Sequence, residues 1–149
     1  MLLESKELIE RYMAAYFTVT KRLHGEIREV LQDDLTMDQF QIIDYIVTRG
    51  NVTSTELAES FAVGKSSITA IITRLADKGI LERTRDEDDR RVVYLSLTDR
   101  GLDNYKKAQA KIMETVSTYL VHFGQDEVEG FIRVFEKLAN LLEEGSGEA

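Results

Sequence analysis

Apolar residues recur at steps of three and four along both ends of this 149-residue chain, which contains no proline. Such spacing places apolar side chains on one face of a helix, and without proline nothing forces a kink. Residues 7–31 show the pattern through Leu8, Tyr12, Tyr16, Val19, Leu23, Ile27 and Val30. Residues 98–123 and 128–142 repeat it. We therefore expect a mainly α-helical fold with long amphipathic helices at the two ends of the sequence.

Three shorter helices are expected between these long ones. A threonine followed three residues later by Gln or Glu has capping-box spacing, and this pair occurs at Thr36 and again at Thr53. Gly64 can cap a third helix, which Gly79 ends. The last two of these helices, over residues 53–78, have the spacing of a helix–turn–helix.

Two strand-like runs follow, ILERT at 80–84 and VVYLSL at 92–97, separated by the polar tip RDEDDRR. This pattern predicts a β-hairpin, in which Val93, Leu95 and Leu97 share a face that can cover a core. The expected fold class is thus mainly α with a small β-hairpin, in a single domain of residues 1–143. The polar residues 144–149 are expected to form a flexible tail.

Composition excludes several kinds of site. The chain has no cysteine, which removes disulfides, thiolate metal sites and cysteine nucleophiles. Its two histidines, His24 and His122, are too few for a histidine-rich metal site. No apolar run is long enough to cross a membrane, and acids stand near the N-terminus where a signal peptide would be basic. We expect a cytoplasmic protein with no metal or other cofactor.

The net charge of −8 argues at first against binding to nucleic acid. Its distribution changes that conclusion. Residues 62–100 hold eight Lys and Arg against seven Asp and Glu, a net charge of +1, whereas the rest of the chain carries −9. Because the local field rather than the global charge governs docking on a polyanion, the charge leaves DNA binding open.

The second helix of the helix–turn–helix has a small, hydroxyl-rich outer face. With Ile68 at the core, steps of about 100° per residue bring Ile71, Ile72 and Leu75 to the same side. The residues that then point outward or flank that face are Lys65, Ser66, Ser67, Thr69, Ala70, Thr73 and Arg74. Short hydroxyl side chains can bond bases or phosphates at close range, and Lys65 adds to the positive end of the helix dipole. Taken alone, the pattern fits an ordinary solvent-exposed helix equally well.

The hairpin tip favours the DNA interpretation. Because the hairpin follows the second helix so closely in sequence, its tip must project beside that helix. There Arg90 and Arg91 can enter a minor groove, and Asp89 can hold them through charge-assisted hydrogen bonds. The remaining acids of the tip, Asp86, Glu87 and Asp88, fit a solvated charged turn better than a functional site.

The sequence resembles the MarR family of winged helix-turn-helix transcription regulators over essentially the whole chain to about residue 143. The segments that carry the resemblance are LAESFAVGKSSITAIITRLADKGILER at 57–83 and DEDDRRVVYLSLTDRG at 86–101. The second is similar to the family's wing, an Asp-x-Arg unit leading into a strand and then Leu-Thr-x-x-Gly, at Asp89, Arg91, Leu97, Thr98 and Gly101. It departs from the family at Glu87, where many members have proline, and in its excess of acids.

We expect a winged-helix lobe over residues 36–98 and a dimerisation layer from the helices at 5–32 and 98–143. These helices are more apolar than the small lobe can cover, which predicts an isologous homodimer. Such a dimer would bind a pseudo-palindromic operator in double-stranded DNA. The candidate DNA-binding residues are Lys65, Ser66, Ser67, Thr69, Thr73, Arg74, Asp89, Arg90 and Arg91. The resemblance implies a repressor that a small molecule releases from DNA.

The composition excludes two classes of effector. Without cysteine the chain cannot sense peroxide by thiol chemistry, and two histidines make it a poor zinc sensor. What remains is a site of apolar walls with a few polar groups. The candidate effector residues are Tyr12, Tyr16, Phe17, His24, Phe40, Tyr45 and Tyr105. They suit an aromatic or lipophilic effector, and they fit an ordinary core equally well.

Other functions are less well supported. The carboxylates at 86–89 suggest a metal site, but Arg90 and Arg91 stand where a calcium loop needs a ligand and a glycine. Neither His24 nor His122 has a nucleophile nearby in sequence, so an enzyme is not expected. The main alternative is a winged-helix module that binds a protein partner and has lost DNA binding.

Overall fold

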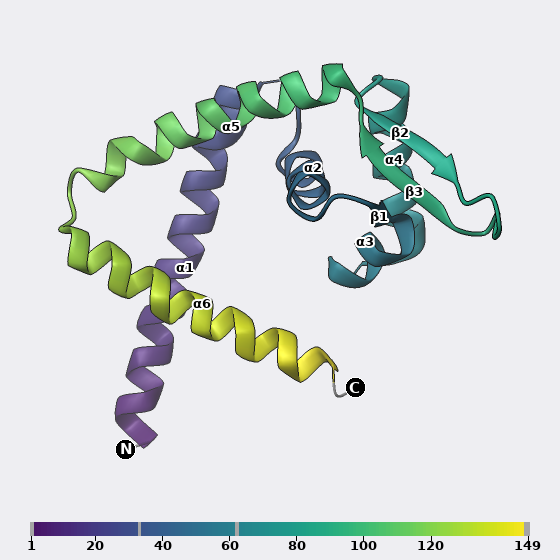
Figure 1. The fold of residues 1–149 in the computed structure, drawn as a ribbon. Coiled ribbons are helices and arrows are strands. Elements are labelled where there is room, and N and C mark those ends of the chain that lie inside the picture. The colour runs from purple at the N-terminus through teal and green to yellow at the C-terminus, as the bar shows by residue number, and fades with distance from the viewer. Residues whose placement is uncertain (1, 33, 62, 148–149) are drawn as a thin grey trace. The chain divides into compact units, whose positions relative to one another are not determined.

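The computed structural model describes residues 2–32, 34–61 and 63–147 (Figure 1). They form mainly helices with a small antiparallel sheet. In chain order the elements are α1 Leu2–Leu31, α2 Met37–Arg49, β1 Val52–Thr53, α3 Ser54–Ser60, α4 Lys65–Asp77, β2 Leu81–Arg85, β3 Val93–Leu97, α5 Asp99–Leu120 and α6 Gln125–Gly147. The chain divides into two compact units, Met1–Ile112 and Met113–Ala149, which we call the winged unit and the C-terminal unit.

Helix starts in the winged unit lie where the threonines predict them. The Thr36 side chain accepts a hydrogen bond from the amide of Gln39 at 3.1 Å, and the Gln39 side chain accepts one from the amide of Thr36 at 3.2 Å. Thr53 accepts from the amide of Glu56 in the same way, at 3.1 Å. After α4, Gly79 has a φ of 74°, a left-handed conformation that glycine adopts without a steric penalty.

The sheet has the strand order β1–β3–β2, so the expected hairpin gains a third strand that the sequence did not predict. In this short strand, Val52 pairs with Leu95 and Thr53 with Tyr94. Two residues are too few to show a period-two pattern. Thr53 is also the N-cap of α3, so its spacing to Glu56 indicates a helix start and gives no sign of a strand. Val52 is fully buried, so β1 fixes the middle of β3 to the start of α3.

The core of the winged unit lies where the helices pack on one another and on the sheet. Its buried side chains include Ile27, Leu31, Ile42, Ile43, Ile46, Leu57, Ile68, Ile72, Leu75, Ile80, Leu81 and Leu95. The expected inward face of α4 is confirmed, since three of its members are buried and Ile71 is half-buried. Helix α4 is therefore anchored along one face and leaves the other to solvent.

A cluster of hydrogen bonds joins the end of α4, strand β3 and the start of α5. The Thr98 hydroxyl donates to the carbonyl of Gly79 at 2.6 Å and accepts from the amide of Gly101 at 3.0 Å. The Thr98 amide donates to the carbonyl of Ile80 at 3.0 Å. Gly101 is buried, and a Cβ at that position would collide with the Ile80 carbonyl oxygen. We call these four residues the Thr98 junction.

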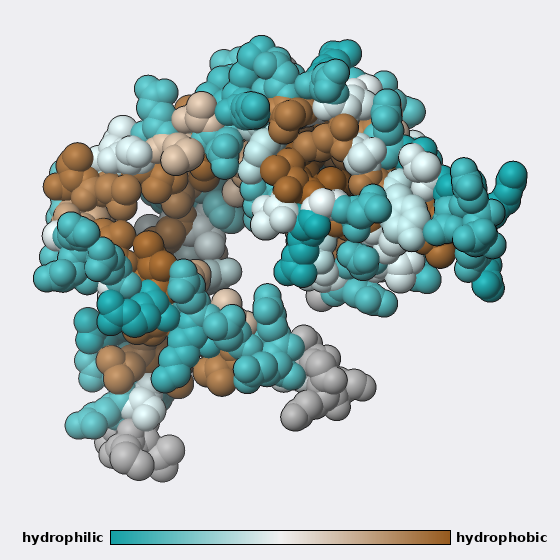
Figure 2. Space-filling model, in the orientation of Figure 1, coloured by the Kyte–Doolittle hydropathy of each residue, from teal (hydrophilic) through white to brown (hydrophobic). Residues whose placement is uncertain are grey.

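Large apolar side chains lie exposed in both units. In the first two thirds of α1 they are Leu8, Ile9, Tyr12, Met13, Tyr16, Phe17 and Val19, which are 49–65% exposed. In the C-terminal unit they include Met113, Tyr119, Leu120, Val121, Phe123, Phe131, Ile132, Val134, Phe135, Leu141 and Leu142. Figure 2 shows hydrophobic surface near the end of α5, in contrast to the hydrophilic tip of the hairpin. Neither unit covers these faces with its own core.

The ends of the last two helices differ from the sequence prediction. Helix α5 ends at Leu120, and α6 continues to Gly147. Residues 144–147 therefore belong to a helix, although the sequence assigned them to an irregular tail, and 148–149 lie outside the described residues. None of the described helices is long and apolar enough to cross a membrane.

Candidate nucleic-acid interface

Helix α4 exposes the side chains that the sequence placed on its outer face. The exposed members are Lys65, Ser66, Ser67, Thr69, Ala70 and Arg74. Thr73 is half-buried, and its hydroxyl oxygen accepts a hydrogen bond from Nη2 of Arg83 at 3.2 Å. Because none of the outer residues ahead of Arg74 and after Lys65 is bulky, this face can approach the edges of base pairs closely.

Among the described residues, no side chain caps the backbone donors at the start of α4. Gly64 is the N-cap and makes no side-chain hydrogen bond. A Ser, Thr or Asp at this position would have supplied an oxygen to the first-turn amides. Lys65 is exposed in that first turn. The uncapped amides, the helix dipole and the lysine together make the start of α4 favourable for an anion such as a phosphate.

The Thr69 hydroxyl has a defined orientation. It donates to the carbonyl oxygen of Lys65, one turn earlier, at 2.7 Å. Its proton is thus used within the helix, and its lone pairs stay available. Thr69 is therefore suited to accept a hydrogen bond from an amino group of adenine or cytosine.

The tip between β2 and β3 holds Arg91 in a fixed position. Arg91 donates from Nε and Nη2 to the two carboxylate oxygens of Asp89, at 3.1 and 3.2 Å, and its amide donates to Oδ1 at 3.1 Å. These bonds lower the pKa of Asp89. The expected grip of Asp89 on a tip arginine is confirmed for Arg91. Since the two side chains are 90% and 44% exposed, water screens the pair, and it orients Arg91 more than it stabilises the fold.

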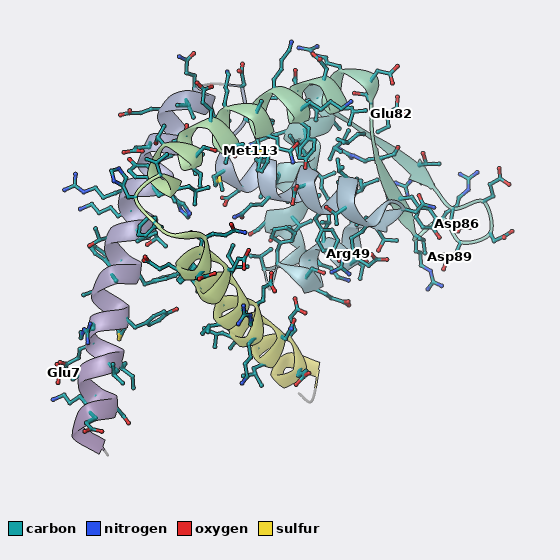
Figure 3. All side chains as sticks on the ribbon, turned by 60° about the vertical axis from the view of Figure 1, so that its left-hand side comes forward. Glu7, Arg49, Glu82, Asp86, Asp89 and Met113 are labelled. Atoms are coloured by element: carbon teal, nitrogen blue, oxygen red, sulfur yellow. The ribbon has the colours of Figure 1, made fainter. Side chains whose placement is uncertain are left out.

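Asp86 organises the same tip, which corrects its interpretation as part of a solvated turn. Its Oδ1 accepts from the amides of Asp88 and Asp89 at 2.8 and 3.2 Å, and its Oδ2 accepts from the Tyr94 hydroxyl at 3.2 Å. The two backbone bonds, followed by that from Tyr94, lower the pKa of Asp86, and the same carboxylate raises the pKa of Tyr94. Figure 3 shows Asp86 and Asp89 at the tip. Glu87 and Asp88 are exposed, as a solvated turn requires.

Two arginines of β2 also lie in this region, and the sequence reasoning missed them. Arg83 donates to Thr73 of α4, as described above, and Nη1 of Arg85 donates to the carbonyl oxygen of Arg90 at 2.9 Å. The available signal was the alternation of the strand, which puts both arginines on the same side as the buried Leu81. Arginine on a core-facing register is the kind of local mismatch that marks functional positions.

The candidate effector residues fall into separate places. Tyr12 stacks on Tyr16 in the exposed half of α1, with ring centroids 5.9 Å apart. Phe40 stacks on Tyr105 at 5.4 Å, and Tyr45 packs edge-on against Phe61 at 5.8 Å. The two others, Phe17 and His24, are exposed on α1. The structure thus brings together two pairs of the seven residues.

Tyr105 has the character of a core residue. It is 6% exposed, its hydroxyl donates to Oδ1 of Asp44, and the same hydroxyl accepts from Gln109. Burial, followed by the bond to Asp44, raises the pKa of Tyr105 to about 12.

An open cavity of about 380 Å³ in the winged unit is lined by other residues: Ile46, Val47, Gly50, Asn51, Leu95, Ser96, Leu97 and Leu102. Within the described residues, no three His, Asp or Glu side chains converge as a metal site would require.

A helix–turn–helix with an exposed hydroxyl and basic face, followed at once by a hairpin with an oriented arginine at its tip, defines a winged helix-turn-helix protein. The profile of the MarR family matches residues 35–93. The chain belongs to the MarR family of transcriptional regulators, as its resemblance predicted, and the curated relatives that match it are regulators rather than enzymes.

Individual relatives agree with this assignment. The chain is 27% identical over 124 residues to the HTH-type transcriptional repressor MdtR of Bacillus subtilis (strain 168), which covers 83% of this chain and 80% of that protein. It is 35% identical to a MepR like protein whose crystal structure contains pseudoligands, with a TM-score of 0.65 over 90% of this chain and 95% of the other. A mutant of MarR from E. coli, complexed with operator DNA, has the same fold (23% identity, TM-score 0.76, 87% and 94% covered).

Proposed function

We propose that this regulator is a repressor that binds a pseudo-palindromic operator in double-stranded DNA. The observation that carries the proposal is the open outer face of α4 beside a tip on which Asp89 orients Arg91. A recognition helix of this kind fits the major groove, and an arginine on the wing reaches the adjacent minor groove. The likeness to a MarR fold complexed with operator DNA, and to a protein named as a repressor, supports the proposal.

Individual roles follow from chemistry and position on α4. Ser66, Thr69 and Thr73 present short hydroxyls and are the proposed readers of base edges. Lys65, Ser67 and Arg74 are the proposed phosphate contacts. Arg74→Ala should weaken binding to all sequences alike, whereas Thr73→Ala should change the discrimination between operator and mutated operator. If both variants lose only non-specific affinity, these roles are assigned wrongly.

At the wing, Arg90 and Arg91 compete for the role of entering the minor groove. Asp89 holds Arg91 by two side-chain bonds, which pre-organise its guanidinium and lower the entropic cost of binding. The backbone carbonyl of Arg90 is held by Arg85, while its side chain is exposed. We assign the groove-inserting role to Arg91, with Asp89 as its positioning residue.

We propose that the active form is a homodimer. Apolar side chains are exposed on α1 and on the C-terminal unit. Burying them in an interface would lower the free energy by roughly 25 cal/mol for each Å² of apolar surface removed from water. A second copy of the chain can cover these faces with its own equivalent faces, which gives an isologous interface. The interface would use the helices at 5–32 and 98–143. Sedimentation velocity should give a dimer at micromolar concentration, and a monomer there would reject the idea.

We propose that an aromatic or lipophilic small molecule releases the dimer from DNA. The pseudoligands of the similar MepR like structure support ligand binding in such a fold. A ligand that favours the DNA-incompetent form by about 3 kcal/mol would weaken operator binding more than about 100-fold. Phenolic and fatty acids should be screened by thermal shift, and hits tested for operator release. Hits that stabilise the protein without releasing DNA would refute the coupling.

The decisive experiment is a fluorescence-anisotropy titration against duplexes selected from genomic fragments, repeated at two salt concentrations. A DNA-binding protein releases counterions and shows a steep salt dependence. The net charge of −8 favours the alternative, a winged-helix module for a protein partner, and that module would retain no duplex. Because the proposed partner is chromosomal DNA, we place the protein in the cytoplasm.

A further inference from the structure

Strand β2 turns two arginines toward the helical side of the sheet. In the register of β2 and β3, Leu81 lies opposite Leu97 and Arg83 opposite Leu95. Residues directly opposite each other in an antiparallel pair share a face, and both Leu81 and Leu95 are buried. Arg83 therefore stands on the core-facing side, one pleat beyond the last buried residue of its strand, and next to α4.

The side chain of Arg83 is tied to the recognition helix by one bond. Its Nη2 donates to the hydroxyl oxygen of Thr73 at 3.2 Å. In the described part of the chain, no carboxylate lies within ion-pair distance of its guanidinium. Arg83 is exposed, and a guanidinium has several N–H donors in a planar fork. Most of these donors, and the whole charge, remain available to a partner outside the chain.

The other arginines of the hairpin make a useful contrast. Arg91 has its charge paired with Asp89, and Arg85 donates to the carbonyl of Arg90, so both bonds stay within the wing. Arg83 alone of these three is bonded to α4. The bond therefore fixes the Arg83 side chain to the recognition helix, on the side of α4 that faces β2.

We propose that Arg83 contacts a DNA phosphate beside the recognition helix and at the same time positions Thr73. The inference rests on the proposed function and adds a residue to it. Arginine matches a phosphate with its fork and keeps further donors for a second acceptor. When Thr73 accepts from Arg83, its own hydroxyl proton is free to turn toward an acceptor on DNA. A single side chain, that of Arg83, thus contacts the DNA backbone and also orients a residue that reads the bases.

The salt dependence of operator binding tests the phosphate contact. Three variants separate charge from hydrogen bonding: Arg83→Ala removes both, Arg83→Gln keeps a donor for Thr73 without charge, and Arg83→Lys keeps the charge without the fork. Arg49→Ala, which removes the same charge from an exposed position at the end of α2, outside the proposed DNA-binding residues and dimer helices, is the control. The probe is a duplex recovered by the wild-type protein from a random-sequence pool, and circular dichroism checks that each variant is folded.

Arg83→Ala and Arg83→Gln should each lower the slope of log Kd against log salt by about 0.9 per arm, or about 1.8 for a two-armed dimer. Arg83→Lys should keep the wild-type slope while weakening binding several-fold. Arg49→Ala should leave the slope unchanged. If Arg83→Ala is unfolded, Arg83→Gln carries the test. A wild-type slope in the Gln or Ala variant overturns the phosphate contact.

A double-mutant cycle tests the positioning of Thr73. Thr73→Val keeps the shape of the side chain and removes the hydroxyl. Its effect on discrimination between the selected duplex and a base-substituted one should be several-fold in the wild-type background and smaller beside Arg83→Ala, because coupled residues are not additive. Additive effects overturn the positioning role. If the wild-type protein retains no duplex at all, the proposed function itself is wrong, and that outcome is distinct from a failure of Arg83 alone.

Discussion

Replacing Gly101 with alanine should destabilise the winged unit by about 2–4 kcal/mol. The added Cβ would collide with the carbonyl oxygen of Ile80 and stand 3.1 Å from its Cγ2. A carbon needs about 3.3 Å from such an oxygen, so the backbone must move by about 1 Å. That movement weakens the bonds from Thr98 to Gly79 and Ile80, each worth about 1 kcal/mol net, and overpacking adds about 1–2 kcal/mol.

Gly130 of α6 provides the matched control. It is also a helical glycine, but an added Cβ meets nothing within 4 Å. Gly130→Ala should therefore be neutral or stabilise by about 0.5–1 kcal/mol, since alanine loses less backbone entropy in a helix. Urea unfolding followed by circular dichroism, at one fixed protomer concentration, gives both values. If the two variants differ by less than about 1 kcal/mol, the close approach at Gly101 does not constrain the fold as argued.

Three further predictions concern the wing and the core. Arg91→Ala should weaken operator binding more than Asp88→Ala, most of all on sites with A·T-rich flanks; equal, negligible losses for Arg90→Ala and Arg91→Ala in anisotropy titrations would show that the wing is only a solvated turn. Because the folded-state pKa of Asp86 is lowered, the turn that it organises should be complete above the ordinary value of 3.8 and be lost as pH falls below it; the NMR shifts of the Asp88 and Asp89 amides should show this transition, and Asp86→Asn should remove it from these two amides while the Arg91 amide still reports the titration of Asp89. Tyr105, with its pKa raised to about 12 from 10.0, should stabilise the fold fully below pH 10 and lose that contribution as pH rises toward 12; urea titrations of Tyr105→Phe should show about 1 kcal/mol less stability at neutral pH and a flatter alkaline decline.

Sequence reasoning succeeded where a local rule specified the backbone. Capping spacing located the starts of α2 and α3, and the helical period divided α4 into a buried and an exposed face. The grip of Asp89 on Arg91 was also foreseeable, because a carboxylate two residues from an arginine in a tight turn is within reach. Each of these features depends on residues that are close together in the chain.

Apart from the local turn that Asp86 organises, the features that were missed depend on residues in different elements. Strand β1 exists only because β3 pairs with it, and two residues carry no pattern of their own. The bond from Arg83 to Thr73 spans ten residues and two elements, so examination of α4 alone could not reveal it. The candidate effector residues were chosen by helix face, and the structure instead buries Tyr105 against Asp44. Whether any of them binds an effector stays a prediction.

The Thr98 junction has a consequence for how a signal could reach DNA. Its hydrogen bonds connect the residues after α4, the end of β3 and the first turn of α5 with no flexible loop between them. A rotation of α5 at this end would therefore tend to carry α4 and the wing with it. The spacing between recognition helix and wing would then be conserved during the motion. Control of DNA binding would act by re-aiming an unchanged surface and would not require that surface to be reshaped.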